Sequence, residues 1–81
     1  DLTRNLPWFS SLDEVRKSVL IDMCFNLGIS GLLKFKSTLS NIERKYYKQA
    51  AISMIDSVWA KQVKDRAKRL SEMMDTGEWP R

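Results

Sequence analysis

The sequence of 81 residues contains no histidine and a single cysteine, Cys24. These absences exclude imidazole-based activation of a nucleophile and an ordinary zinc site. Cys24 cannot form an internal disulfide, and its place in an apolar stretch favours a role as a small packing residue. The three glycines, Gly28, Gly31 and Gly77, lack the spacing of a phosphate-binding loop. We therefore expect neither a metal site nor a cofactor.

Long apolar runs are also missing from the sequence. No stretch reaches the roughly 20 apolar residues of a membrane-spanning helix, so we expect no transmembrane segment and no membrane partner. The sequence begins at Asp1 with neither an initiator methionine nor a signal-peptide pattern, which suggests that it was cut from something longer. Its length and its content of 43% hydrophobic and 30% charged residues suit one globular domain over residues 1–81.

Helical periodicity dominates what is present, and it predicts an all-α fold. The most apolar helix is expected between Ser11 and Gly28, because Ser11 and Glu14 form a capping-box pattern and Gly28 can end a helix. The middle of this helix is apolar almost all the way round, which is typical of a helix enclosed by other elements. A single polar lane runs along it with i, i+4, i+8 spacing: Ser18, Asp22 and Asn26.

Shorter helices are expected around this central helix, at about 2–6, 37–44, 47–55, 58–62 and 65–75. Ser57 can cap the fourth of them, and Gly77 ends the last. The expected architecture is a compact bundle of short helices around one central apolar helix. The residues predicted to point inward from the shorter helices are Leu39, Ile42, Tyr47, Ala50, Ala51, Met54, Ile55, Ala67, Leu70, Met73 and Met74.

Among the ten acidic residues, Asp22 is the one candidate for chemistry. Most of the others fall at predicted helix ends or on polar faces, where a solvated structural role is expected. Asp22 lies within the apolar helix, where a buried carboxylate would mark a functional site. The simpler interpretation is that Asp22 accepts a hydrogen bond from a neighbouring group.

Basic residues exceed acidic ones, 14 against 10, which gives a formal charge of +4. No groove-reading or stacking motif accompanies this charge, so a solvated surface is favoured over nucleic-acid binding. The three tryptophans, Trp8, Trp59 and Trp79, are expected to complete the core. A polyanion would be attracted most strongly by the cluster near the last helix, which comprises Lys61, Lys64, Arg66, Lys68 and Arg69.

An ordered series of short motifs resembles a known family. The motifs are 11–16 (SLDEVR), 23–28 (MCFNLG), 31 with 34–35 (KF), 57–59 (SVW) with 62, 66–69 (RAKR) and 76–79 (TGEW). In this order they resemble the C-terminal helical lobe of phage lysozymes of the T-even type, glycoside hydrolase family 24. The resemblance extends from about Leu6 through nearly the whole chain, which makes the set more specific than any one motif.

The resemblance implies one lobe of a muramidase. The family hydrolyses the bond between N-acetylmuramic acid and N-acetylglucosamine of peptidoglycan, in a cleft between a small N-terminal lobe and the helical lobe. The family's catalytic glutamate and aspartate belong to the N-terminal lobe, and none of the ten acids here matches them. The chain is thus expected to bind bacterial peptidoglycan and to be inactive alone, with the N-terminal lobe supplied by the parent protein or another chain. A phage endolysin would pass from the host cytoplasm to the periplasm and cell wall.

The resemblance also assigns roles to individual residues. Phe25, Thr38 and Ser53 match positions that contact the glycan or its peptide, and Asn26 matches an amide that faces the cleft. Asn26 is one methylene shorter than the glutamine of the best-known relative, and Ser53 replaces an asparagine there. No catalytic residue is expected in this chain.

Further positions match residues that support the cleft or the fold. Arg66 matches an arginine that would pair with the missing catalytic glutamate, and Trp79 matches a tryptophan that closes back on the fold. Val63 replaces a threonine that would cap the last helix, so Asp65 is expected to take over the cap. The two residues expected to support the cleft are Trp59 and Gln62.

Two other interpretations remain open from the sequence. The first is a non-enzymatic basic helical module that binds a polyanion such as nucleic acid, which would shift with DNA in a salt-dependent way and not with glycan. The second is an autonomously folding fragment with no activity.

Overall fold

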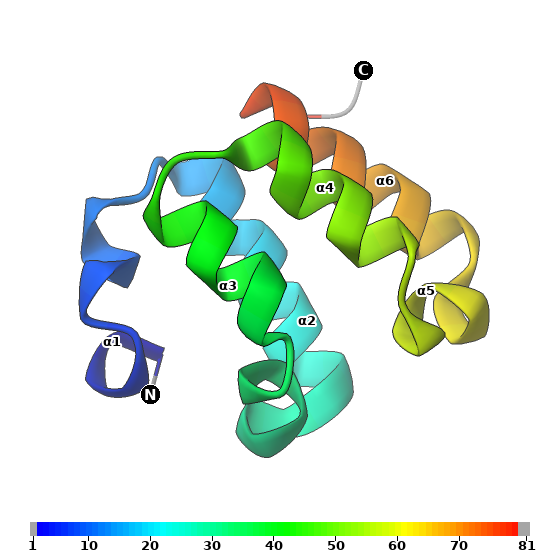
Figure 1. Cartoon of the computed structure of the whole chain (residues 1–81), viewed down its shortest axis with the longest axis horizontal. Coiled ribbons are helices and arrows are strands. Elements are labelled where there is room, and N and C mark those ends of the chain that lie inside the picture. Colours follow the sequence, from blue (N-terminus) through cyan, green and yellow to red (C-terminus); the bar gives the residue numbers. More distant parts are fainter. Residues whose placement is uncertain (1, 80–81) are drawn as a thin grey trace.

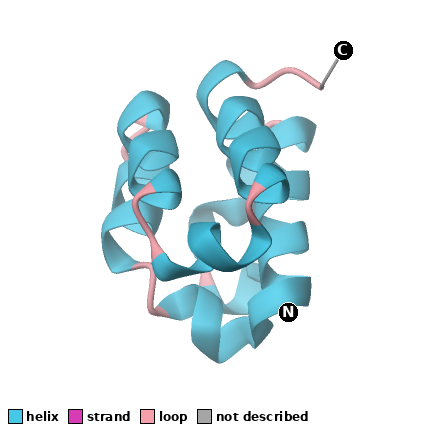
Figure 2. Cartoon of the chain, turned by 90° about the vertical axis from the view of Figure 1, so that its right-hand side faces the viewer, coloured by secondary structure: helices cyan, strands magenta, loops and turns pink. Residues whose placement is uncertain are grey.

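A computed structural model of the chain describes residues 2–79. All regular elements among these residues are helical (Figure 2), which confirms the predicted all-α fold. In chain order they are α1 (Leu2–Asn5), the 3₁₀ segment η1 (Pro7–Ser11), α2 (Glu14–Leu33), α3 (Lys36–Glu43), α4 (Tyr47–Ile55), α5 (Val58–Val63) and α6 (Asp65–Thr76).

The most extensive contact between helices is that of the antiparallel pair α4 and α6 (Figure 1). Helix α4 also contacts α3, and α6 also contacts α2 and α5. The inward positions predicted for α3 and α6 are confirmed, whereas Ile55 of α4 is 48% exposed because it shares the outer side of that helix with Ile52. The fully enclosed core side chains are Val19, Leu20, Met23, Leu32, Ile42, Met54 and Met74.

Helix α2 is not enclosed on all sides, so that prediction is wrong. Its buried residues before the kink, Val15, Val19, Leu20 and Met23, have i, i+4, i+5, i+8 spacing and form one face. On another side of the helix Ile21 is 53% exposed and Phe25 is 90% exposed. The all-round apolar pattern therefore combines a core face with an apolar surface that nothing in residues 2–79 covers.

Of the two ends predicted for this apolar helix, the first needs correction and the second is confirmed. The N-cap is Asp13, whose side chain accepts a hydrogen bond from the Arg16 backbone N–H, and Ser11 instead ends the 3₁₀ segment. The predicted break at Gly28 is confirmed, because its φ of 76° and ψ of 163° are not helical and divide α2 into two helical segments at a kink. The chain resumes helical geometry as far as Leu33, and the burial of Leu32 in the core anchors this extra turn.

Helix α6 begins without the expected cap. Lys64 occupies the N-cap position with φ 48° and makes no capping side-chain bond, so Asp65 does not cap the helix. The predicted end is confirmed, because Gly77 is left-handed and donates its N–H to the Met73 carbonyl. Trp79, just beyond it, is 56% exposed, so the prediction that it packs into the core is wrong.

Candidate functional site

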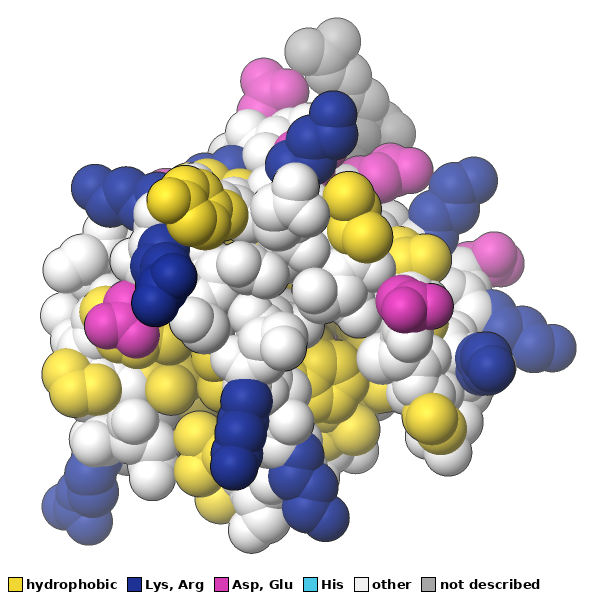
Figure 3. All heavy atoms as spheres, viewed as in Figure 1, with side chains coloured by type: hydrophobic (Ala, Val, Ile, Leu, Met, Phe, Trp, Pro, Cys, Tyr) yellow, Lys and Arg dark blue, Asp and Glu magenta, His cyan; other side chains and the backbone are white. Residues whose placement is uncertain are grey.

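A groove of about 610 Å³ lies where the C-terminal end of α2, the start of α3, the end of α4 and helix α5 meet. Figure 3 shows it as a hollow between α3 and α5 with hydrophobic side chains at its base. Its lining residues are Leu27, Gly31, Lys34, Phe35, Lys36, Ser37, Thr38, Ser53, Ser57, Val58, Trp59 and Gln62.

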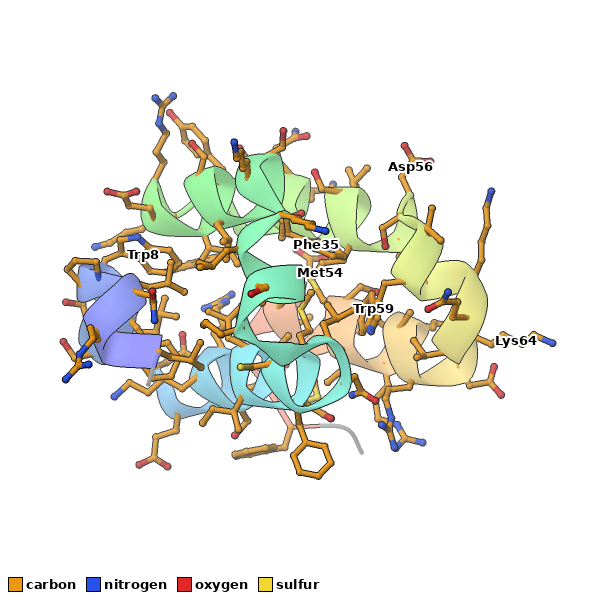
Figure 4. All side chains as sticks on the ribbon, turned by 90° about the horizontal axis from the view of Figure 1, so that it is seen from below. Trp8, Phe35, Met54, Asp56, Trp59 and Lys64 are labelled. Atoms are coloured by element: carbon orange, nitrogen blue, oxygen red, sulfur yellow. The ribbon has the colours of Figure 1, made fainter. Side chains whose placement is uncertain are left out.

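Two aromatic rings form the base of this groove. Phe35 and Trp59 meet edge to face, with ring centroids 6.2 Å apart and an angle of 84° between the planes. Figure 4 shows both side chains beside Met54, which is fully buried. Trp59 is 3% exposed, and its indole Nε1 donor has no hydrogen-bond partner among the described residues. The core role predicted for Trp59 is thus confirmed, with one polar atom left unsatisfied.

Hydroxyl and amide groups surround the aromatic base. Thr38 on α3 is buried, Ser53 on α4 is half-buried and Gln62 on α5 is exposed. Ser57 caps α5 as predicted, because its Oγ accepts from the Ala60 backbone N–H at 3.2 Å. Groups that donate and accept hydrogen bonds therefore lie above an apolar base, as in many sites for small organic ligands.

The charge of the groove is positive. Its lining residues in the described chain include Lys34 and Lys36, both exposed, and no carboxylate. A general acid and a second carboxylate, which glycoside hydrolysis requires, are therefore not found at this groove within residues 2–79. The arrangement is suited to bind a neutral or anionic ligand, not to cleave a glycosidic bond by itself.

A second cluster of predicted residues lies along the polar lane of α2. Arg66 Nη1 on α6 donates to Asn26 Oδ1 at 3.0 Å and lies 3.9 Å from Asp22 Oδ1. Asn26 Nδ2 in turn donates to the backbone and side-chain oxygens of Asp22, at 2.8 and 3.2 Å. The Asp22 side chain is 40% exposed, which confirms its structural role as a hydrogen-bond acceptor. Asn26 and Arg66, paired here, do not line the groove.

Phe25 is separate from both the groove and the Asn26–Arg66 pair. It belongs to a shallow depression on the α2 and η1 side, which is lined also by Leu2, Phe9, Ile21 and Cys24. The predicted residues therefore fall into three groups on the surface. The groove residues for which no role was predicted include Lys36 and Ser37.

Within residues 2–79 neither a metal centre nor a single membrane-spanning helix is found. Among the described residues no group of three or more histidine, cysteine or acidic side chains is placed to hold a metal ion. No single helix in residues 2–79 is long and apolar enough to cross a membrane. Only the pair Glu14–Leu33 and Lys36–Glu43 reaches the necessary length and hydropathy together, and it is bent by 102°.

The described elements define the class as an all-α bundle with a groove lined by aromatic and polar residues. No family model matches the chain. It is 36% identical over 69 residues to probable T4-type lysozyme 1 of Dictyostelium discoideum and 38% identical over 69 residues to probable T4-type lysozyme 2. The pre-baseplate central spike protein Gp5 of Enterobacteria phage T4 is 30% identical over 71 residues.

These alignments cover most of this chain and much less of its relatives. They include 85% of the chain but 41% of each Dictyostelium lysozyme, and 88% of the chain but 12% of the phage protein. The chain is therefore similar to the C-terminal portion of T4-type lysozymes, and the resemblance drawn from the sequence motifs is confirmed.

Proposed function

We propose that residues 1–81 form a single helical domain that binds peptidoglycan as the C-terminal lobe of a T4-type lysozyme. The groove carries this proposal, because it brings together Thr38, Ser53, Trp59 and Gln62 from three helices of the chain. These residues were assigned to substrate contact or cleft support from the resemblance alone. Their convergence on one groove supports a shared role in binding the cell-wall polymer.

The chemistry of the groove suits peptidoglycan. Sugar rings and acetamido methyl groups present apolar faces that can pack on the partly buried Phe35, which contacts Trp59 edge to face, while their hydroxyl and amide groups can bond to Ser53 and Gln62. Lys36 on the rim would attract the carboxylates of the peptide stems. Contact of the glycan with Phe25 would require a strand that extends beyond the groove, since Phe25 lies outside it.

The proposal assigns hydrolysis to an N-terminal lobe outside these residues. That lobe would bring the general acid and the second carboxylate, and Arg66 would pair with the acid. The exposed side chains of Ile21 and Phe25 form an apolar surface on α2 that such a lobe could cover. The chain alone is accordingly proposed to bind cell wall without cleaving it.

Two assays on purified bacterial sacculi test this function. In co-sedimentation the chain should bind, and Ser53→Ala combined with Gln62→Ala should weaken binding about thirtyfold, since two lost hydrogen bonds of about 1 kcal/mol each amount to about 2 kcal/mol. The matched control combines Ser40→Ala with Gln49→Ala, two exposed positions outside the groove. In a turbidity assay the wall suspension should not clear.

Two results would contradict the proposal. Equal binding by the groove variant and the control variant would show that the groove does not bind the cell wall. Clearing at a rate near that of a complete T4-type lysozyme would show that the catalytic groups lie within the chain.

A polyanion-binding module is the second candidate function. The exposure of Lys61, Lys64, Lys68 and Arg69 favours it, because these side chains can reach phosphates without rearrangement. Figure 4 shows Lys64 extending away from the bundle. A mobility shift with DNA that disappears as salt rises, together with no binding to sacculi, would select this candidate over the lysozyme lobe.

A further inference from the structure

A second groove, of about 480 Å³, runs between α4 and α6. Helix α4 forms the front of the molecule in Figure 1, and α2, with its exposed apolar side, lies behind it. Figure 4 separates the same two helices from another direction. The groove is therefore distinct from the apolar surface of α2. It is lined by Lys48, Ala51, Ile52, Ile55, Asp56, Ser71, Glu72 and Asp75.

The wall that α4 contributes to this groove is apolar and accessible. Ile52 is 55% exposed and Ile55 is 48% exposed, and their i, i+3 spacing places them on the same side of the helix. Ala51 and Ser71 are buried beneath them. Single exposed apolar side chains are common on protein surfaces, but these two share one concave surface with a defined base.

Carboxylates dominate the rim of the groove. Asp56, Glu72 and Asp75 are exposed, and Lys48 is the single cation among the lining residues, so the local formal charge is −3 + 1 = −2. The whole chain has the opposite sign, +4. No lysine or arginine within residues 2–79 forms an ion pair with any of these three carboxylates. Figure 3 shows acidic side chains beside hydrophobic ones over the α4 side of the molecule.

We propose that the groove between α4 and α6 docks a cationic amphipathic helix of a partner protein. Apolar side chains spaced i, i+3 or i+4 on that helix would pack on Ile52 and Ile55, as in other helix-in-groove complexes. Its lysines or arginines would lie along Asp56, Glu72 and Asp75. The attraction between these opposite charges would speed association and set the orientation of the partner helix. Two antiparallel helices leave between them the trough into which a third helix packs.

A titration with a designed helix tests this docking site. The probe is a peptide of about four helical turns with leucines at i, i+4 spacing and lysines on the flanks, added to the full ¹⁵N-labelled chain at low salt. Backbone amide shifts are expected to be confined to α4 and α6, and a peptide with glutamates in place of lysines should not bind. Glu72→Gln combined with Asp75→Asn should weaken binding about tenfold, roughly threefold for each exposed charge.

Two variants separate charge, apolar contact and loss of fold. Ile52→Ser should weaken binding while the circular dichroism of the chain stays unchanged, because Ile52 lies outside the core. Glu43→Gln, an exposed acid on α3 outside the groove, is the matched control and should bind as the unaltered chain does.

Three outcomes would overturn the proposal. The first is equal affinity for the lysine and glutamate peptides. The second is a set of shifts spread over other faces of the molecule. The third is concentration-dependent dimerisation that Ile52→Ser abolishes, which would make a second copy of the chain the occupant of the groove. Failure of cell-wall binding would leave these results unaffected, since no residue is shared between the two grooves.

Discussion

Replacement of Arg16 is expected to destabilise the chain more than any other change to a charged residue on its surface. Arg16 Nε donates to the Met74 carbonyl at 2.6 Å, and Nη2 donates to the Asp75 carbonyl at 2.9 Å. Its guanidinium carbon lies 3.5 Å from the centre of the Tyr47 ring. One side chain of α2 therefore holds the end of α6 and the start of α4.

The cost of Arg16→Met follows from these contacts. A hydrogen bond that involves a charged group contributes about 1.5–3 kcal/mol, and we take the lower value for each of the two carbonyl bonds because water reaches the end of α6. Stacking on Tyr47 adds about 0.5–1 kcal/mol, whereas the ion pair with Asp13, 40% exposed on the acid side, adds little. The expected loss in free energy of unfolding is thus about 3–4 kcal/mol. A domain of this size has about 4–12 kcal/mol in total, so the variant should be only marginally folded.

Urea and thermal unfolding, followed by circular dichroism, measure this loss. The melting temperature should fall by at least 12 °C or so, at about 4–8 °C per kcal/mol. Arg16→Lys should lower the free energy of unfolding by about half as much. An ammonium group can donate to one of the two carbonyls, but it lacks the planar guanidinium that donates to both. Arg69→Met, an exposed position on α6, is the control and should change stability by less than about 0.5 kcal/mol.

The interaction with Tyr47 has its own measurement. A double-mutant cycle of Arg16→Met with Tyr47→Leu should give a coupling energy of about 0.5–1 kcal/mol. If Arg16→Met lowered the free energy of unfolding by less than about 1 kcal/mol, the contacts of Arg16 with α4 and α6 would not contribute to stability as argued above.

Three further changes test other features of the structure. Lys64→Gly should stabilise the chain by about 1 kcal/mol, because Lys64 has φ 48°, whereas Lys68→Gly in the interior of α6 should destabilise it by a similar amount in the same unfolding assay. Gly77→Ala should lower the free energy of unfolding by about 1–2 kcal/mol, because alanine disfavours the left-handed backbone at this position. The loss should be greater still because the new Cβ would lie 2.7 Å from Arg16 Nη1, and this additional loss should vanish in an Arg16→Met background. Trp59→Phe should change the free energy of unfolding by less than about 2 kcal/mol, since it removes a buried unpaired donor together with ring volume, and a greater loss would show that Nε1 has a partner.

The fold was predictable where helices keep a polar face. Helices α3 and α6 alternate apolar and polar residues with the helical period, so their inward positions could be assigned from the sequence. In α2 the apolar pattern extends around the helix, and such a pattern contains no information about which side faces outward. The exposed side of Ile21 and Phe25 could therefore not be distinguished from the buried side of Val19 and Met23.

The start of α2 shows a second feature that could not be predicted from the sequence. Ser11 and Asp13 are both good N-cap residues, and the choice depends on the backbone that precedes them. The 3₁₀ segment that follows Pro7 includes Ser11, which leaves Asp13 as the first residue free to cap the helix. Contacts such as those of Arg16, which reach 58 and 59 residues along the chain, have no periodic signal at all.

Some of the residues that line the groove could be predicted, from the family resemblance and not from helical periodicity. The resemblance identified Thr38, Ser53, Trp59 and Gln62, and the fold places them in one groove. Periodicity and composition would not have grouped them, because they come from α3, α4 and α5. Trp59 was expected to support the cleft, and its buried Nε1 has no partner among residues 2–79, whereas Asn26 Oδ1 accepts a hydrogen bond from Arg66 outside the groove.

The pairing of Arg66 bears on how the proposed lobe would meet its catalytic partner. A guanidinium has five N–H donors, and Asn26 engages Arg66 through Nη1 alone. Asp22 lies 3.9 Å from that same nitrogen, while the Arg66 side chain is 52% exposed. Asn26 and Asp22 on α2 thus fix the position of Nη1. The other two guanidinium nitrogens, Nε and Nη2, remain available to bind a carboxylate in bidentate fashion. Under the proposed function, Asn26 and Asp22 would position Arg66 for an acid of the N-terminal lobe. An Asn26→Ala variant should then weaken association with a separately supplied N-terminal lobe while leaving the groove's affinity for sacculi unchanged.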